Sequence, residues 1–115
     1  MAALTAITPT NAGATSAGAA VAASDTISTD ILGARGAFLE ILNGNASPDS
    51  MTISDHGTTA AGNALTSNQI SASVTNATQK VFYISPAQAN PATGLVTVTH
   101  SVTSTVTYKL YPLSR

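Results

Sequence analysis

Residues 94–111, GLVTVTHSVTSTVTYKLY, decide the fold class of this chain. β-Branched and polar residues alternate there in two runs, which a short break rich in Ser and Thr separates. A period of two is typical of half-buried antiparallel strands, because successive side chains point to opposite faces of a sheet. The stretch therefore predicts two closing strands at residues 95–100 and 105–111. The side chains expected to face inward are Val96, Val98, Val106, Tyr108 and Leu110.

The same alternation recurs upstream of these two strands. Its clearest case is AFLEILN at residues 37–43, which follows a glycine and precedes an Asn-Gly-Asn turn signal. One face of this expected strand mixes Phe38 and Leu42 with Glu40, so we expect a loop or a partner to cover part of it. Further strands are expected at residues 20–28, 51–54, 70–74 and 79–85.

These segments amount to about seven or eight short strands, and no segment has the period of an amphipathic helix. We therefore predict an all-β fold, a single β-sandwich of the jelly-roll or Greek-key kind, formed by residues 21–115. Residues 1–20 are mostly Ala, Thr, Gly and Ser and offer few large side chains to bury. We expect them to form an extended N-terminal arm, either frayed or ordered against a neighbouring subunit.

The charge of the chain limits the class of partner. Only 8% of its residues are charged and the net charge is −1, whereas about 25% are charged in an ordinary soluble domain. Four Lys and Arg residues form no basic cluster, so we expect no nucleic acid. No segment is long and apolar enough to span a bilayer, and no basic residue precedes the Ala-rich residues 17–24 as in a signal peptide. A surface of this kind favours association with other protein.

One adjacent acid–imidazole pair, Asp55-His56, is a candidate for catalysis. It could orient a nucleophile such as Ser54 or Ser50, because nucleophilic catalysis needs an oriented base beside the hydroxyl. However, the pair lies beside a glycine in a polar stretch, and Ser occurs throughout the chain. We therefore expect a solvated loop and no catalytic residues.

Two groups of residues are candidates for binding a metal ion. The chain has no cysteine, so a site at His100 would need His56 or carboxylates, and no recognisable ligand spacing is present. Asn45, Asp49 and Asp55 carry the oxygen ligands that calcium takes, but they match no calcium-loop pattern. We expect neither a metal nor a cofactor.

Other polar and aromatic residues have structural interpretations. Glu40 is expected to pair across strands with Arg35 or Lys80. The three tyrosines could form a sugar platform, but the chain has no Trp, and we expect them to pack in the core or at an interface. They are Tyr83, Tyr108 and Tyr111. Residues 55–68 are expected to be a long surface loop that contacts a partner.

Three stretches between Asp25 and Leu113 resemble a group of small proteins encoded among the structural genes of tailed bacteriophages. The stretches are AFLEILNGN at 37–45, closely followed by Ser47-Pro48, then GLVTVT at 94–99 with the connection before it, and VTSTVT at 102–107. In that group the first resembles a strand ending in Asn-Gly, and the other two resemble a closing hairpin. The resemblance implies a virion component of the capsid decoration (cement) type or a related head protein, without catalytic residues.

The leading hypothesis is therefore a structural virion protein that decorates and stabilises the capsid of a tailed bacteriophage. Its expected location is the capsid surface, and its expected partners are the major capsid protein and further copies of itself, as a trimer. Residues 1–20 are the first candidate for these contacts. We expect no enzymatic activity and no small-molecule substrate. The alternatives are a tail-tube or head–tail joining subunit, and a secreted carbohydrate-binding or adhesive β-module.

Overall fold

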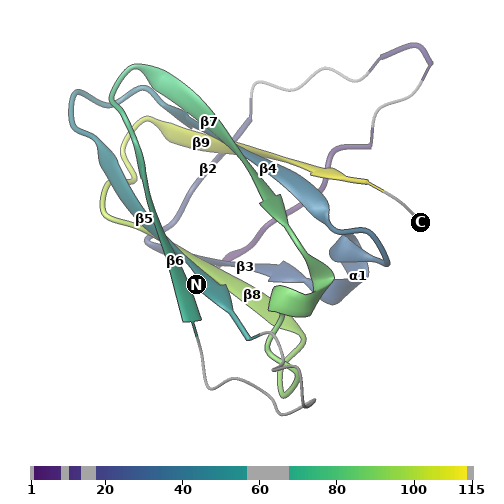
Figure 1. Ribbon diagram of the computed structural model, residues 1–115. Helices are drawn as coiled ribbons and strands as arrows, with labels where there is room; N and C mark the ends of the chain where they lie inside the picture. The colour runs from purple at the N-terminus through teal and green to yellow at the C-terminus, as the bar shows by residue number, and fades with distance from the viewer. Residues whose placement is uncertain (1, 9–10, 14–17, 57–67, 114–115) are drawn as a thin grey trace.

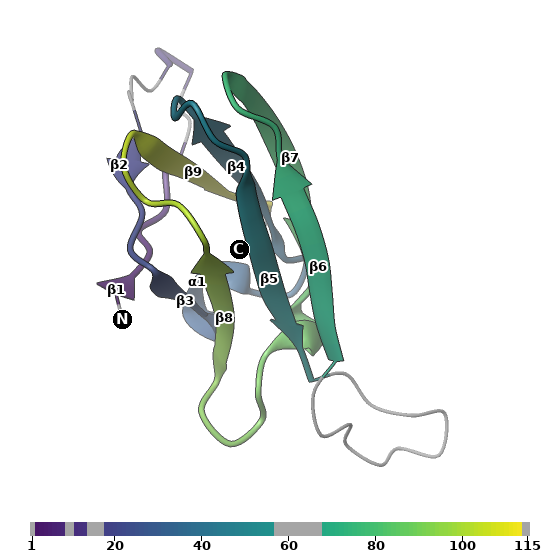
Figure 2. The same ribbon diagram turned by 90° about the vertical axis from the view of Figure 1, so that its left-hand side faces the viewer.

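The computed structural model describes residues 2–8, 11–13, 18–56 and 68–113, and in them it confirms the predicted β-sandwich (Figure 1). Strands form a five-stranded sheet, in the order β1-β3-β8-β5-β6, and a four-stranded sheet, in the order β2-β9-β4-β7. The two sheets face each other (Figure 2). The strands are β1 (Ala2–Ala3), β2 (Ala19–Ala20), β3 (Ser24–Ser28), β4 (Ala37–Asn43), β5 (Asp49–Asp55), β6 (Asn68–Val74), β7 (Thr78–Ile84), β8 (Leu95–His100) and β9 (Val106–Pro112).

The antiparallel pairs are nested inside one another. β2 pairs with β9, β3 with β8, β4 with β7 and β5 with β6. The chain is thus one long antiparallel ribbon that turns back between β5 and β6. Pairing of β4 with β9 and of β5 with β8 rolls this ribbon into two layers. Eight strands arranged in this way form a jelly roll, one of the two topologies expected from the sequence.

The core lies between the layers and follows the predicted alternation. All five side chains expected to face inward from the closing strands are buried, and the least buried of them, Tyr108, is only 6% exposed. From β4, Leu39 and Ile41 join them with no exposed surface. The period of two therefore identified which face of each strand is buried.

One predicted strand is divided in the structure. Residues 20–28 separate into β2 in one sheet and β3 in the other, because the chain crosses between the layers at residues 21–23. Helix α1 (Thr29–Leu32) follows, with the Ser28 hydroxyl accepting a hydrogen bond from the Asp30 N–H. A 3₁₀ turn, η1 (Pro86–Gln88), follows β7. Single turns of this length have no period to detect in a sequence. No helix in the described ranges is long and apolar enough to cross a membrane.

Strand β1 lies outside the nested scheme. It is parallel to β3 and adds a fifth strand at the edge of that sheet (Figure 2). Leu4, just after β1, is 5% exposed and belongs to the core. The described start of the expected N-terminal arm therefore contacts the sandwich of its own chain.

Candidate functional site

The outer surface of the four-stranded sheet carries a row of aromatic side chains. The strand register places Phe38 on β4 between Tyr83 on β7 and Tyr111 on β9. Phe38 is 42% and Tyr83 51% exposed. Their rings meet edge to face with centroids 6.2 Å apart, and the Tyr83 hydroxyl donates to the Arg35 carbonyl over 2.9 Å. Together with Val81, which is also exposed, these three aromatic residues define what we call the aromatic face.

Glu40 lies in the next row of the aromatic face, between Val81 on β7 and Lys109 on β9. Arg35 and Lys80 were the two expected partners of Glu40, and the structure rules out Lys80. Lys80 belongs to the opposite face of β7, and its Nζ donates to the Ser73 carbonyl over 3.1 Å. Register explains the error, since a shift of one residue moves a side chain to the other face of the sheet. The face therefore carries one acid and one base on neighbouring strands.

The three tyrosines do not gather on one surface. Tyr108 points into the core, as predicted, and its hydroxyl accepts a hydrogen bond from the Thr5 N–H over 2.9 Å. Tyr83 and Tyr111 lie on the aromatic face, at either side of Phe38. A sugar platform made of all three is excluded by this arrangement. An apolar row that contains two of them remains, in which Tyr83 is exposed and Tyr111 is half-buried.

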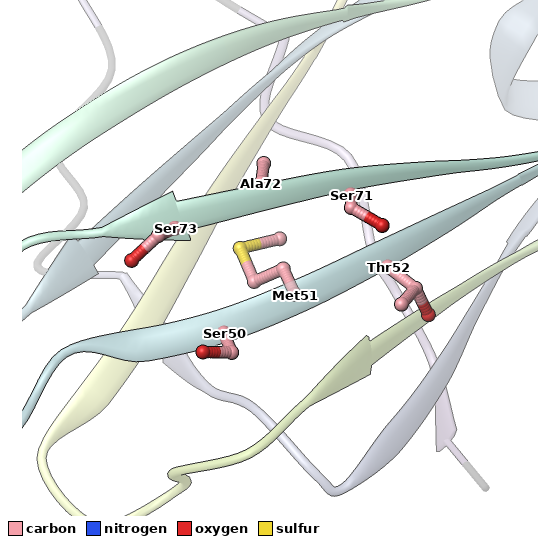
Figure 3. A pocket seen from close by; sticks show the side chains of 6 residues that line it. All are labelled: Ser50, Met51, Thr52, Ser71, Ala72 and Ser73. Atoms are coloured by element: carbon pink, nitrogen blue, oxygen red, sulfur yellow. The ribbon is translucent and has the colours of Figure 1, made fainter.

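The outer surface of the other sheet is lined with hydroxyl groups. Ser24, Thr99, Thr52 and Ser71 follow one another across four neighbouring strands, and the hydroxyls of Thr52 and Thr99 are hydrogen-bonded to each other. A shallow depression of about 450 Å³ lies at β5 and β6 (Figure 3). Its described lining contains no titratable side chain and can offer only neutral hydrogen bonds. The lining residues are Ser50, Met51, Thr52, Ser71, Ala72 and Ser73.

A polar cluster is buried between the two layers. His100 at the end of β8 lies between Asp49 of β5 and Asp25 of β3, with Nδ1 2.6 Å from Asp49 Oδ2 and Nε2 3.9 Å from Asp25 Oδ2. Neither carboxylate has exposed surface. Asp49 Oδ1 also accepts hydrogen bonds from the backbone N–H groups of Ser101 and Val102. Charged groups without such partners would be costly to bury, so the cluster joins three strands of one sheet while its polar atoms stay satisfied.

Sequence reasoning missed this cluster. His100 and Asp49 were considered only as metal ligands, and Asp25 was not considered at all. The available signal was a polar residue in an inward position of three separate strands. Only the register that sets these strands side by side shows that the three residues meet. Because the cluster is closed to solvent, it offers no access for a substrate.

Among the predicted candidates for catalysis, the structure places Ser50 far from the acid–imidazole pair Asp55-His56. The Ser54 hydroxyl accepts a hydrogen bond from the Thr97 N–H over 2.9 Å. Ser50 lies near the far end of β5, about 20 Å from His56 at strand spacing. His56 lines a second depression, of about 420 Å³, with neighbours from α1 and from the segment around η1. Most of the expected partner-contacting loop at 55–68 lies outside the described residues.

The oxygen ligands considered for calcium are also apart. Asp49 and Asp55 are the first and last residues of β5, about 20 Å apart. The Asn45 side chain donates to the Ser104 carbonyl and accepts from the Ser47 N–H. In the described part of the chain, no group of three or more His, Cys, Asp or Glu residues is arranged to hold a metal ion.

Comparison with known proteins adds no relative to this description. No family model, no curated protein and no solved structure matches the chain. The fold and its surfaces define a charge-poor jelly-roll protein with an exposed aromatic face. Function is therefore inferred from these features and from the resemblance noted in the sequence.

Proposed function

We propose that this protein is a structural protein of a tailed-bacteriophage virion, which decorates the capsid and stabilises it by binding the major capsid protein. The observation that carries the proposal is the aromatic face. Phe38, Val81 and Tyr83 are each more than 40% exposed, side by side on two paired strands. Contiguous apolar groups of this kind mark surfaces that other proteins cover.

The composition of the aromatic face suits a protein partner. Aromatic side chains dominate the binding energy of many interfaces, because each buries a large area and keeps a defined orientation. Glu40 and Lys109 supply opposite charges in the next row, which favours one docking orientation over others. A net charge of −1 also lets many copies pack closely on one shell without strong mutual repulsion.

Two further observations support a virion role over other structural roles. Jelly rolls recur in viral capsid proteins, although also in lectins and cupins, so the fold supports the proposal without deciding it. The stretches at 37–45, 94–99 and 102–107 add the resemblance to phage structural proteins. In the fold the first stretch contains β4, the second lies mostly in β8, and the third forms the connection to β9 and its first two residues.

The test uses capsids purified from a phage that lacks this protein. Purified protein is added back, and electron microscopy and sedimentation measure its occupancy on the shell. We expect regular surface protrusions and a capsid that withstands a higher temperature. Phe38→Ser should reduce occupancy at least tenfold, while Ser71→Ala, on the outer surface of the other sheet, should leave it unchanged.

Three outcomes would overturn the proposal. Absence of binding to intact capsids would remove the capsid as partner. Normal heads with missing or broken tails in the deletion phage would assign the protein to the tail tube or the head–tail joint. Binding to a glycan array that depends on Tyr83 would favour a carbohydrate-binding module.

A further inference from the structure

Residues 2–8, which we call the plug segment, cross the open side of the sandwich from one sheet to the other. The segment starts as β1 beside β3, where the Leu4 N–H donates to the Thr26 carbonyl over 2.9 Å. It ends at β9 in the other sheet, where the Ile7 N–H donates to the Leu110 carbonyl over 2.7 Å. The plug segment therefore completes the edge of both layers.

One side chain anchors the plug segment. Leu4 is buried among core residues of both sheets, whereas Ala3 and Thr5 on either side of it are exposed. The Thr5 N–H adds one hydrogen bond, to the Tyr108 hydroxyl in the core. The described hydrogen bonds of the plug segment go to β3 and β9, and we call the space between these two strands that receives Leu4 the slot. It would accept the same seven residues from any copy of the chain.

The connection that follows the plug segment is longer than its own chain requires. Ile7 meets β9 at Leu110 and Ala19 meets it at Tyr108, two residues along the same strand. These positions are about 7 Å apart at strand spacing. Residues 8–18 join them, and eleven residues can span about 36 Å when extended. The extended connection is therefore about five times as long as the gap that it closes within one chain.

We infer that the plug segment is an exchangeable strand, which inserts into the slot of a second copy of this protein and links copies in the assembled state. After exchange, the contacts that the plug segment makes within one chain form between two chains instead. No additional contact surface is needed, which is the usual basis of domain swapping. Copies held close together raise the effective concentration of neighbouring slots and favour it. The inference concerns association between copies and does not rest on the capsid as partner.

The test exploits the absence of cysteine from the chain. Ala3 and Thr26 are register partners in β1 and β3, so cysteines at these two positions are suitably placed for a disulfide. One preparation carries Ala3→Cys, and an isotopically heavy preparation carries Thr26→Cys. The two are unfolded together, refolded at high concentration and oxidised. Exchange predicts a disulfide between a light and a heavy chain in at least a quarter of the molecules.

The matched control uses Leu42→Cys and Thr107→Cys, which are register partners on the outer side of the neighbouring strands β4 and β9. Mixed chains carrying these single changes should form no specific bridge, while one chain carrying both should close a bridge within itself. The inference is overturned if Ala3→Cys and Thr26→Cys bridge only when both are in one chain. It is equally overturned if the control chains crosslink as readily as the test chains.

A second measurement needs no cysteine. Native mass spectrometry of the unmodified chain at rising concentration should detect dimers or larger rings. Leu4→Ser, which withdraws the anchor, should return them to monomers, while Phe38→Ser should not. Monomers at all concentrations would overturn the inference. So would an oligomer that Phe38→Ser abolishes and Leu4→Ser leaves intact, because copies would then associate through the aromatic face.

Discussion

Replacement of Asp49 by alanine tests the interpretation of the buried polar cluster as a structural joint. In the native fold this carboxylate contacts His100 over 2.6 Å and accepts two backbone hydrogen bonds, from Ser101 and Val102, over 3.0 and 3.2 Å. It has no exposed surface. Asp49→Ala removes all three interactions at once, and its cavity is too enclosed for bulk water to replace them.

The expected loss follows from those contacts. Asp49→Ala leaves the N–H groups of Ser101 and Val102 and the ring of His100 without this partner, and each buried polar group left without a partner costs about 1–3 kcal/mol. We therefore expect Asp49→Ala to lower the free energy of unfolding by about 3–5 kcal/mol. Asp49→Asn keeps one oxygen for the backbone groups and should lose roughly half as much. A chain of this length has about 6–17 kcal/mol of stability in all, so both variants should fold.

Urea unfolding followed by far-UV circular dichroism measures these differences, with unchanged slopes showing that the folded and unfolded states stay comparable. Asp30→Ala is the matched control, because this carboxylate is exposed in the first turn of α1 and should contribute at most about 1 kcal/mol. Equal losses for Asp30→Ala and Asp49→Ala would refute the structural role of the cluster. A loss for Asp49→Asn as large as that for Asp49→Ala would show that the backbone hydrogen bonds are not what matters.

Three further predictions concern other parts of the fold. Leu4→Ala should lower the free energy of unfolding by about 2–4 kcal/mol, the usual cost of truncating a buried leucine, and urea unfolding would contradict a core position if the loss were negligible. Gly36→Ala should reduce the yield of folded protein and its melting temperature, because Gly36 has a φ of +85° and an added Cβ would lie 2.2 Å from the Ile84 carbonyl oxygen. Phe38→Ser should change stability by less than about 1 kcal/mol while it weakens docking, and a parallel loss of both in melting and binding assays would mean that this ring is part of the core.

The positions of several strands could be predicted from the sequence, because apolar and polar residues alternate regularly along them. The closing strands and β4 were located within one residue, and the buried face of each was identified from the period of two. The order of the strands could not be obtained in the same way. Nested pairing depends on which sheet each strand joins, and the crossing at residues 21–23 that divides β2 from β3 has no periodic signal. The parallel pairing of β1 is likewise set by Leu4 entering a core formed by distant strands.

The surfaces were less predictable than the core. The Phe38 side of β4 was expected to need cover, but its row with Tyr83 and Tyr111 exists only through the register of three strands. The same limit explains why Lys80, one of the two partners expected for Glu40, does not pair with it: a shift of one residue turns the Lys80 side chain to the opposite face of the sheet. Asp25 and His100 are polar residues at inward positions of their strands, and this pattern could have indicated a buried polar cluster. An alternating pattern is usually searched for its apolar members alone.

The nested pairing of the strands also determines the order in which the strand pairs can form while the chain is being synthesised. The innermost pair, β5 with β6, can form as soon as both strands have left the ribosome, but β2 must wait for β9, with Ala19 opposite Tyr108. Pairings this distant in sequence form slowly, over milliseconds to seconds in comparable folds. The plug segment is made before its slot, since Leu110 belongs to the last strand. While one chain awaits its own last strand, its first strand is free to enter a neighbour that has already finished.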